Sequence, residues 1–357
     1  MKKKQVLYSK MSGLYIGSLI VAALIIVVAV FYAIDTVNNR NKNCSKLPKS
    51  APLQNLTKED ATYQRPLRDF FVKSSYNSCA SGKYKNDWVD LCALSHAIKS
   101  GCRLLDFEIY DVKGVPVVAV SDSPKFTLKH SYNSIPLDKV LKRVEDEAFG
   151  GDVNGADPLF LNFRIKSDHV EVCDEVAKSL TSQRNGTLAS RLLSSDFSYE
   201  YQGQNFAKVP LKTLCQKVII MASENKRISE SKLAEFVNLA PSPLFRVIPF
   251  NSLASQDLTD LTAYTKTRLA MITPFNSDNY TSASGVTLGV QFNAMNFQTN
   301  DKNLQAYNEQ FVKNGNRAFY LKSEPYAPTE IPDAKPLPKD STFGTTVYEN
   351  KYLSFNL

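Results

Sequence analysis

The feature that most constrains this chain is a long apolar segment near its N-terminus. Residues 14–34 carry no charged side chain and are almost entirely apolar. About 20 such residues form a helix long enough to cross the hydrocarbon core of a bilayer. Tyr15 and Tyr32 stand near its two ends, where aromatic rings favour the membrane–water interface. The sequence therefore predicts a transmembrane helix over residues 13–34, preceded by a basic segment over residues 1–12.

A cleaved signal peptide is the alternative interpretation of this segment. Signal peptides have a shorter apolar region followed by small residues at the cleavage site. Residues 35–39 read Asp-Thr-Val-Asn-Asn, which favours a retained anchor. Four lysines precede the segment, so we expect a single-pass protein with a cytoplasmic N-terminus and a luminal or external body.

The chain has a formal net charge of +8, and much of the excess lies in two groups, at residues 2–10 and 40–49. Because both groups flank the apolar segment, we interpret them as charge that faces lipid headgroups rather than nucleic acid. A generally basic surface is the alternative for the second group. We therefore expect membrane lipids, anionic headgroups among them, as partners, and no nucleic acid.

The remainder has the composition of a folded domain. Of 357 residues, 43% are hydrophobic and 22% are charged, which excludes wholesale disorder. The six cysteines allow disulfides, but Cys92 and Cys102 lie in apolar stretches, where we expect buried free thiols. Three Asn-X-Thr sequons, at Asn55, Asn185 and Asn279, are typical of a translocated domain.

Periodic patterns divide the rest of the chain into a linker, a body and a tail. Residues 35–65 are polar and predict a linker, and residues 328–357 predict a proline-rich extended tail. Between them, helical and strand patterns alternate, which is typical of a parallel sheet, open or closed into a barrel. The expected helices span residues 88–98, 137–149 and 170–180, and the expected strands span residues 103–110, 115–120, 158–165 and 217–222.

Four motifs in the body resemble the X and Y boxes of the phosphoinositide-specific phospholipases C. They are PLRDFFVKSSYNS at residues 66–78, GCRLLDFEIYD at 101–111, QFNAMNFQT at 291–299 and NGNRAFYLKSEP at 314–325. The resemblance implies a distorted (β/α)8 TIM-type barrel made of an X-box-like half over residues 66–225 and a Y-box-like half over residues 226–327.

The resemblance also implies a chemistry with two histidines and a calcium ion. In the family, a base deprotonates the inositol 2-hydroxyl, a histidine protonates the leaving oxygen, and calcium offsets the phosphate charge. The position of the first histidine is Tyr76 here, and the second falls at Val120 or Ser121. Tyrosine, with a reference pKa near 10, is a poor proton shuttle at neutral pH.

The cation site implied by the resemblance is half kept. Asn77, Asp106 and Glu108 match calcium ligands, whereas the fourth acid aligns with Arg164. A guanidinium there repels a divalent ion and can replace it by fixed charge, as an arginine does in bacterial relatives. We therefore treat Tyr76, Asp106, Glu108 and Arg164 as the catalytic positions of a degenerate site, and Asn77, Asp106 and Glu108 as metal ligands only if a cation binds. A buried ion-pair cluster without function is the alternative.

The residues that hold the ring phosphates in the family are altered as well. Both lysines become Met221 and Ser223, while Ser229 and Arg268 align with sugar-contacting positions, Arg246 competing with the latter. The chain's histidines are His96, His130 and His169, and we expect ordinary surface or helix residues. A histidine brought into the barrel mouth by the fold is the alternative.

Three functions remain open from the sequence. The first is a membrane-anchored, phospholipase-C-like barrel that has lost catalysis and serves as a binding or structural module. The second is an active phosphodiesterase with altered, metal-free chemistry, in which Asp106 or Glu108 is the base and Arg164 the electrostatic clamp. The third is a receptor for acidic lipid headgroups. We expect no cofactor, and calcium only if activity is retained.

Overall fold

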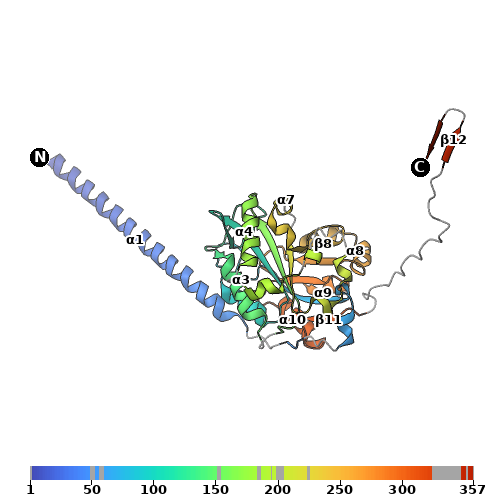
Figure 1. The fold of residues 1–357 in the computed structure, drawn as a ribbon. Helices are drawn as coiled ribbons and strands as arrows, with labels where there is room; N and C mark the ends of the chain where they lie inside the picture. The colour runs from blue at the N-terminus through green and yellow to red at the C-terminus, as the bar shows by residue number, and fades with distance from the viewer. Residues whose placement is uncertain are drawn as a thin grey trace.

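A nearly closed barrel of eight parallel strands forms the body of the computed structural model (Figure 1). The structure describes residues 2–48, 53–55, 60–150, 154–182, 186–193, 195–197, 205–222, 226–323, 347–350 and 353–356. In spatial order the strands are β7 (Val237–Leu239), β6 (Val218–Ala222), β5 (Leu159–Lys166), β2 (Leu104–Val112), β1 (Phe70–Ser75), β10 (Phe292–Met295), β9 (Leu269–Thr273) and β8 (Phe245–Pro249). Within the described ranges no ladder joins β7 to β8, so the barrel is open at that seam. The expected distorted TIM-type barrel is confirmed.

Three further strands extend this sheet. β3 (Val115–Val118) pairs antiparallel with β2 and with β4 (Ile135–Pro136), and β11 (Phe319–Leu321) pairs antiparallel with β1. The expected strand over residues 115–120 is present as β3, but it runs antiparallel to β2 and not in the parallel barrel. Lys113 and Gly114 both adopt positive φ, 57° and 79°. This two-residue turn reverses the chain, so β3 returns along β2 as a hairpin.

The helices cover the outside of the barrel. Their apolar residues recur at three- and four-residue spacing: in α3, for example, Leu137, Val140, Leu141, Val144 and Ala148 are buried. The helices of the body are α2 (Leu91–Lys99), α3 (Leu137–Ala148), α4 (Val170–Thr181), α5 (Gly186–Arg191), α6 (Leu211–Leu214), α7 (Lys226–Ser229), α8 (Leu258–Thr265), α9 (Ser282–Thr287) and α10 (Lys302–Lys313).

The interior of the barrel changes from apolar to polar along the strands. Phe160, at the amino end of β5, packs with Phe292 at a ring distance of 5.2 Å in the inner core. Because side chains alternate along a strand, Asn162 and Arg164 follow Phe160 on the same face. The carboxyl end of the barrel, where TIM barrels carry their active sites, is therefore lined by polar side chains.

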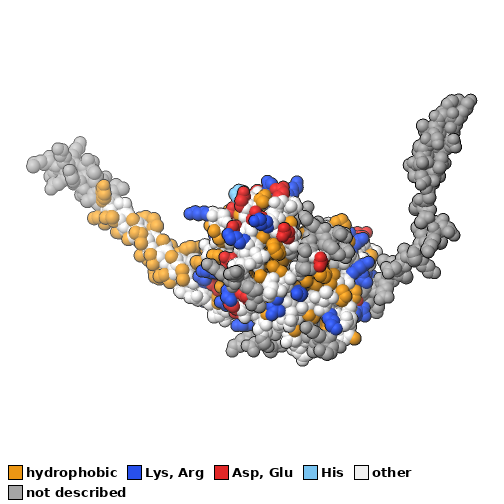
Figure 2. Space-filling view, in the orientation of Figure 1, with side chains coloured by type: hydrophobic (Ala, Val, Ile, Leu, Met, Phe, Trp, Pro, Cys, Tyr) orange, Lys and Arg blue, Asp and Glu red, His pale blue; other side chains and the backbone are white. Residues whose placement is uncertain are grey.

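The helix α1 (Lys2–Lys46) is long and apolar enough to cross a membrane, and its apolar part is not buried by the body (Figures 1 and 2). It continues past the expected end at residue 34, so the first part of the expected linker over residues 35–65 is helical. In the expected tail over residues 328–357, β12 (Val347–Asn350) and β13 (Leu353–Asn356) pair as a separate two-stranded sheet; the remainder of that segment lies outside the described residues.

The last turns of α1 dock on the body along one face of the helix. We call this stripe the anchor clamp; it consists of Tyr32, Thr36, Arg40, Asn43 and Cys44, which are spaced three to four residues apart except for the final pair. Their partners lie in the segment 87–92 and in Tyr132. This docking explains why the helix extends beyond its apolar part.

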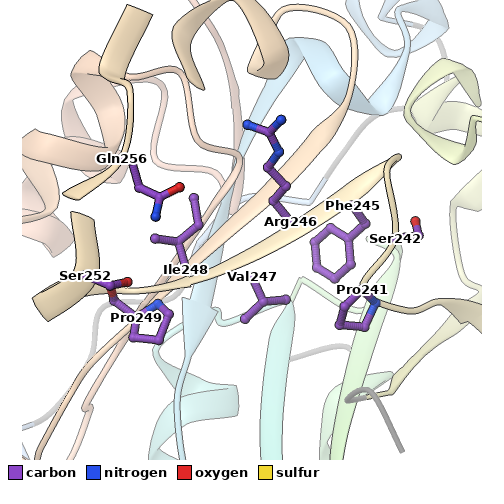
Figure 3. Close-up of a pocket in the computed structure, with 9 residues that line it drawn as sticks. All are labelled: Pro241, Ser242, Phe245, Arg246, Val247, Ile248, Pro249, Ser252 and Gln256. Carbon is purple, nitrogen blue, oxygen red and sulfur yellow. The ribbon is translucent and has the colours of Figure 1, made fainter. Parts of the chain in front are cut away.

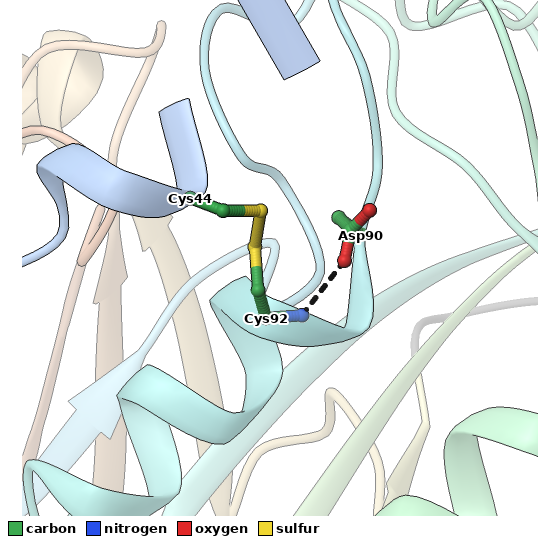
Figure 4. Close-up of side chains that lie close together, drawn as sticks. All are labelled: Cys44, Asp90 and Cys92. Atoms are coloured by element: carbon green, nitrogen blue, oxygen red, sulfur yellow. Dashed lines mark hydrogen bonds between the residues drawn. A yellow bond between two sulfur atoms is a disulfide. The ribbon is translucent and has the colours of Figure 1, made fainter. Parts of the chain in front are cut away.

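A disulfide between Cys44 and Cys92 closes the anchor clamp (Figure 4). The expectation that Cys92 is a free thiol is therefore wrong, whereas Cys102 is free and buried. Local apolar context did not reveal that Cys92 stands in the first turn of α2, facing α1. Asp90 caps α2 by accepting from the Cys92 amide at 2.9 Å, and it also accepts from Arg40 Nε at 2.7 Å.

Candidate functional site

The register between β2 and β5 assembles the candidate site. Asp106 pairs with Asn162, and Glu108 pairs with Arg164. In each strand the two residues are separated by one position, so all four side chains lie on the inner face of the sheet. Asn77 joins them from the turn after β1, where it adopts a positive φ of 43° that Asn tolerates better than most residues.

The Arg164 guanidinium lies at the centre of this cluster. Its Nε donates to both carboxylate oxygens of Asp106, at 3.2 and 3.1 Å, and its Nη1 donates to Glu108 Oε2 at 3.0 Å. Its Nη2 donates to Asp106 Oδ1 at 2.9 Å and to the side-chain oxygen of Asn77. One fixed cation therefore binds all three residues that were expected to ligate a metal.

Asp106 and Glu108 are buried, and each of their carboxylate oxygens accepts at least one hydrogen bond. Asp106 is fully buried and also accepts from the Asn77 amide at 2.9 Å and from Asn162 Nδ2 at 2.6 Å. Glu108 is 2% exposed, and its second oxygen accepts from the Tyr110 hydroxyl at 2.5 Å. Buried carboxylates of this kind are stable only when they are paired and hydrogen-bonded, as here.

Tyr76 covers the guanidinium. Its ring centroid lies 4.4 Å from Arg164 Cζ, a cation–π contact. Burial raises the pKa of the Tyr76 hydroxyl, and the positive charge of Arg164 only partly opposes this. Burial also lowers the pKa of Arg164, but the attraction of Asp106 and Tyr76 outweighs it, and the pKa stays well above its ordinary value. The cluster holds a permanent cation and a phenol that stays protonated.

The side-chain oxygens of Asn77, Asp106 and Glu108 do not fit a calcium ion while Arg164 is in place. Calcium takes six to eight oxygen ligands, and each side-chain oxygen offered by Asn77 and Asp106 accepts a hydrogen bond from the guanidinium. Glu108 divides its oxygens between Arg164 and Tyr110. We therefore derive no chemical step from a bound metal at this position.

All three histidines are described, and none hydrogen bonds to the cluster. His96 is in α2, with its ring 6.2 Å from Phe297, and burial together with Lys73 lowers its pKa to about 4. His169 is exposed and contacts Asp111 at 2.9 Å. His169 follows the carboxyl end of β5, but its ring contacts Asp111 and not the cluster, and His96 lies in α2.

His130 is the exception to the expectation of ordinary histidines. Its Nδ1 lies 3.0 Å from the Ser121 hydroxyl and also contacts Asp122. Ser121 is one of the two positions at which the resemblance places the second histidine. The loop over residues 122–129 thus places the His130 imidazole beside Ser121. Val120, the other candidate position, is buried.

The remaining predicted site residues make no hydrogen bond to the cluster among the contacts described, although Met221 stands opposite Asn162 in the β5–β6 register. Met221, at a lysine position of the family, is fully buried in the inner core. Ser229, in α7, follows β6 and bonds only to the Lys226 carbonyl among the contacts described. Arg268 precedes β9 and therefore lies at the amino end of the barrel, 5.3 Å from the Tyr264 ring. Ser223 lies outside the described residues.

A cavity of about 420 Å³ lies along β8, away from the charged cluster (Figure 3). Its lining comes from the edge strand and the segments that flank it: Pro241, Ser242, Phe245, Arg246, Val247, Ile248, Pro249, Ser252 and Gln256. Arg246, the alternative to Arg268, stacks 3.9 Å from the Tyr264 ring and pairs with Asp260 at 2.7 Å. Its guanidinium is thus already partnered within the chain.

Sequence reasoning missed three residues that support the cluster. Asn162 and Tyr110 hydrogen bond to the two acids, and Tyr84 packs against Tyr76 at a ring distance of 6.5 Å. The alternation of β2 and β5 contains a signal for two of them. Asn162 stands two positions from Arg164, and Tyr110 stands two positions from Glu108, on the same strand faces.

The barrel with a polar cluster at its carboxyl end defines the class of protein, a TIM barrel of the phospholipase C type. The sequence matches the X domain of phosphatidylinositol-specific phospholipase C over residues 63–224 and the Y domain over residues 245–325. The chain belongs to the phosphatidylinositol-specific phospholipase C family.

Individual relatives are distant. The chain is 24% identical to 1-phosphatidylinositol 4,5-bisphosphate phosphodiesterase 1 of Saccharomyces cerevisiae over 216 residues, which are 60% of this chain and 22% of the yeast protein. The crystal structures of PLC21 from S. officinalis and from L. pealei each superpose with a TM-score of 0.58 and 17% identity, over 73% of this chain and 38% of theirs. The chain thus spans well under half of these relatives.

Proposed function

We propose that this chain is a membrane-anchored phospholipase-C-like barrel that has lost phosphodiester cleavage and acts as a binding or structural module. The observation that carries the proposal is the position of the Arg164 guanidinium, which binds Asn77, Asp106 and Glu108 at once. An acid that is held in ion pairs and saturated with donors is a poor general base, because proton uptake would break those contacts.

Among the described residues that contact this cation, none is a histidine that could protonate the leaving oxygen. Tyr76 occupies the place of the first histidine, and burial raises its pKa. A general acid works best with a pKa near the operating pH, and its loss costs about 10²–10⁴-fold in rate. Two such losses together would leave little turnover, as the proposal requires.

The test is a turnover assay on the full chain reconstituted in vesicles. Phosphatidylinositol, its phosphorylated forms and glycerophosphodiesters are the substrates, each with calcium and with a chelator. We expect no release of inositol phosphate above background. Release that disappears in Asp106→Asn, a variant that keeps the shape of the side chain, would contradict the proposal; release unchanged in that variant identifies a contaminant.

A phosphodiesterase with altered chemistry is the second candidate, and the placement of His130 favours it. The imidazole lies beside Ser121 and Asp122, where it can supply a proton, while Arg164 supplies the fixed cation. In this case turnover does not depend on calcium and is abolished in His130→Gln. His169→Gln, which changes an exposed histidine that contacts Asp111 and not the cluster, is the matched control and leaves turnover intact.

Membrane anchoring is the second part of the proposal. The apolar stretch of α1 supports the anchoring. The anchor clamp supports it as well, because the docked turns and the apolar stretch belong to one unbroken helix. We propose a cytoplasmic N-terminus and an external or luminal body, since disulfides persist in oxidising compartments. Resistance of the full chain to alkaline extraction from membranes tests the anchor; release into the soluble fraction contradicts it.

A further inference from the structure

The anchor clamp holds α1 on the body by one covalent bond and a small set of polar contacts. Arg40 pairs with Asp90 at 2.7 Å, and these side chains are 43% and 18% exposed. Asn43 Nδ2 donates to Asp87 Oδ1 at 2.9 Å. Partly exposed ion pairs and polar contacts of this kind contribute little individually, because water competes for both partners. The disulfide is therefore the strongest single link between the helix and the body.

The chain that follows α1 restrains the helix far less than the clamp does. Beyond Lys46, the first described backbone hydrogen bond to the body is that of the Gln54 amide, which donates to the Asn316 carbonyl at 2.8 Å. Leu53, beside it, is 7% exposed. Six residues separate Lys46 from Leu53, and six extended residues span at most about 20 Å. With the clamp open, these residues form a tether of that length.

The disulfide is accessible to small molecules, whereas three free thiols of the body are not. Cys44 and Cys92 are both partly exposed, and Cys79, Cys102 and Cys173 are buried. Burial raises the pKa of each of these three buried thiols. Because the thiolate is the species that attacks a disulfide, the buried thiols compete poorly with a thiol from solution.

The surroundings of the disulfide favour a cleavage that leaves Cys92 as the thiolate. Cys92 lies in the first turn of α2, where the amide groups of the helix N-terminus stabilise negative charge. The carboxylate of Asp90, the N-cap of this helix, lies close by (Figure 4), but its charge is balanced by Arg40. A leaving thiolate of lower pKa departs faster, so an incoming thiolate attacks Cys44 Sγ.

We propose that the Cys44–Cys92 disulfide is a redox switch that small thiols such as glutathione open. One thiolate attacks Cys44 Sγ, which breaks the bond between the two sulfurs, forms a mixed disulfide at Cys44 and releases Cys92 as a thiolate that takes up a proton. A second thiol displaces the first from Cys44. Two thiols are thus oxidised to one disulfide, and the protein gains two thiols.

Opening of the switch frees the body to turn relative to α1. In the oxidised protein the clamp fixes the angle between the helix and the barrel, and in the reduced protein the body moves on the tether of residues 47–52. This inference rests on the docking of α1 on the body. It depends neither on whether α1 crosses a membrane nor on whether the barrel has turnover.

Two measurements on the full chain in detergent micelles test the switch. Differential alkylation with mass spectrometry gives the reduced fraction of each cysteine in glutathione buffers. Energy transfer gives the distance distribution between dyes that are attached to p-acetylphenylalanine, a residue that needs no thiol for labelling. The two labelled positions are Asn41 in α1 and Lys139 in α3, which are both exposed.

Two variants serve as controls. The double variant Cys44→Ser, Cys92→Ser has no disulfide to open, so its distance distribution is broad and does not respond to glutathione. Arg40→Ala removes a polar contact of the clamp and keeps the disulfide, so its distribution stays narrow in oxidised buffer. Wild-type protein is measured before and after reduction, so the test does not depend on the folding of the double variant.

We expect glutathione to reduce Cys44 and Cys92 together in the folded protein, with the mixed disulfide on Cys44 in acid-quenched samples. The wild-type distance distribution then broadens to that of the double variant. A disulfide that resists glutathione until urea unfolds the chain overturns the proposal. Reduction that leaves the distribution narrow also overturns it, since the polar contacts then hold the clamp. A broad distribution in oxidised Arg40→Ala does the same, because the disulfide then does not fix the helix.

Discussion

Arg164 is the single residue on which the chemistry of the site depends. In Arg164→Glu, three buried carboxylates face one another beside Asn77, and removal of one partner of a buried ion pair costs about 3–5 kcal/mol. We expect the melting temperature of this variant to fall in chelator and to recover with calcium, because the ligand set is then complete and bound ligand stabilises the folded state. Differential scanning fluorimetry with a calcium titration measures both effects.

Arg164→Gln is the control for this experiment. It removes the cation but adds no carboxylate, so it is destabilised without a comparable recovery in calcium. Wild-type protein should show no calcium-dependent shift, because the guanidinium holds the ligands. A wild-type melting temperature that rises with calcium as much as that of Arg164→Glu would show that the site accepts a metal as it stands.

Lys73 makes stability depend on pH. It is 4% exposed on β1, its Nζ lies 5.6 Å from the Phe311 ring, and burial lowers its pKa from 10.5 to about 8. Between pH 8 and 10.5, Lys73 is therefore protonated in the unfolded chain and largely neutral in the folded protein. The free energy of unfolding consequently increases as the pH rises through this range. Below pH 8 the penalty is constant, at about 3 kcal/mol.

Lys73→Met removes this penalty. We expect the variant to be more stable than wild type at pH 7 and the difference to shrink towards pH 10.5, as measured by urea unfolding across that range. Burial also lowers the pKa of Lys322, to about 7, so Lys322 changes the stability with pH in the same direction. Because Lys322 is present in both proteins, its effect cancels in the difference between Lys73→Met and wild type. Lys139→Met, at an exposed position of α3, is the control. A pH-independent difference would show that the Lys73 ammonium is solvated.

Among the elements, α1 depends on the Cys44–Cys92 disulfide for its attachment. The bond joins residues 48 positions apart, and a link of that length typically stabilises a fold by about 2–4 kcal/mol. We expect Cys92→Ser to lower the melting temperature of the body and to speed hydrogen exchange in residues 36–46. Cys44→Ser should match it, and the double variant should add nothing, because both single changes break one bond. Additive losses would contradict a disulfide between these residues.

At the level of elements, the three helices and four strands that the periodicity predicted are all present within a few residues, whereas β1 and β7 to β11 were not among the expected strands. The resemblance to the phospholipase C motifs also placed Asp106, Glu108 and Arg164 in one site, as the structure shows. The register of β2 against β5, which makes Asn162 a member, depends on packing between strands and is not encoded locally. The anchor clamp was missed in the sequence. The spacing of Thr36, Arg40 and Asn43 indicates that they share one face of a helix, but it does not indicate that this face packs against residues 87–92.

For the molecule as a whole, the sequons report which side of a membrane the body occupies. Asn55 is exposed, whereas Asn279 is 7% exposed and donates through Nδ2 to the carbonyls of Asn296 and Thr299. A glycan at Asn279 would break these bonds. Asn185 lies outside the described residues, so the experiment uses an Asn185→Gln background.

In a eukaryotic secretory system we expect one glycan, removed by Asn55→Gln and unaffected by Asn279→Gln. Mobility after glycosidase treatment, with mass spectrometry of the peptides, measures this. The absence of any glycan on membrane-integrated protein would place the body on the cytoplasmic side, and a modified Asn279 would contradict its burial.

Because the barrel is open between β7 and β8, each of these two strands pairs with a neighbour on one side only among the described residues. We expect such edge strands to move more than the strands between them. Along the circuit, β2 and β1 stand farthest from the seam, each the fourth strand in from one edge. Asp106 and Asn77 belong to that rigid sector. We therefore expect opening of the seam to displace β7 and β8 more than β1 and β2, and to leave the contacts of the Arg164 guanidinium intact.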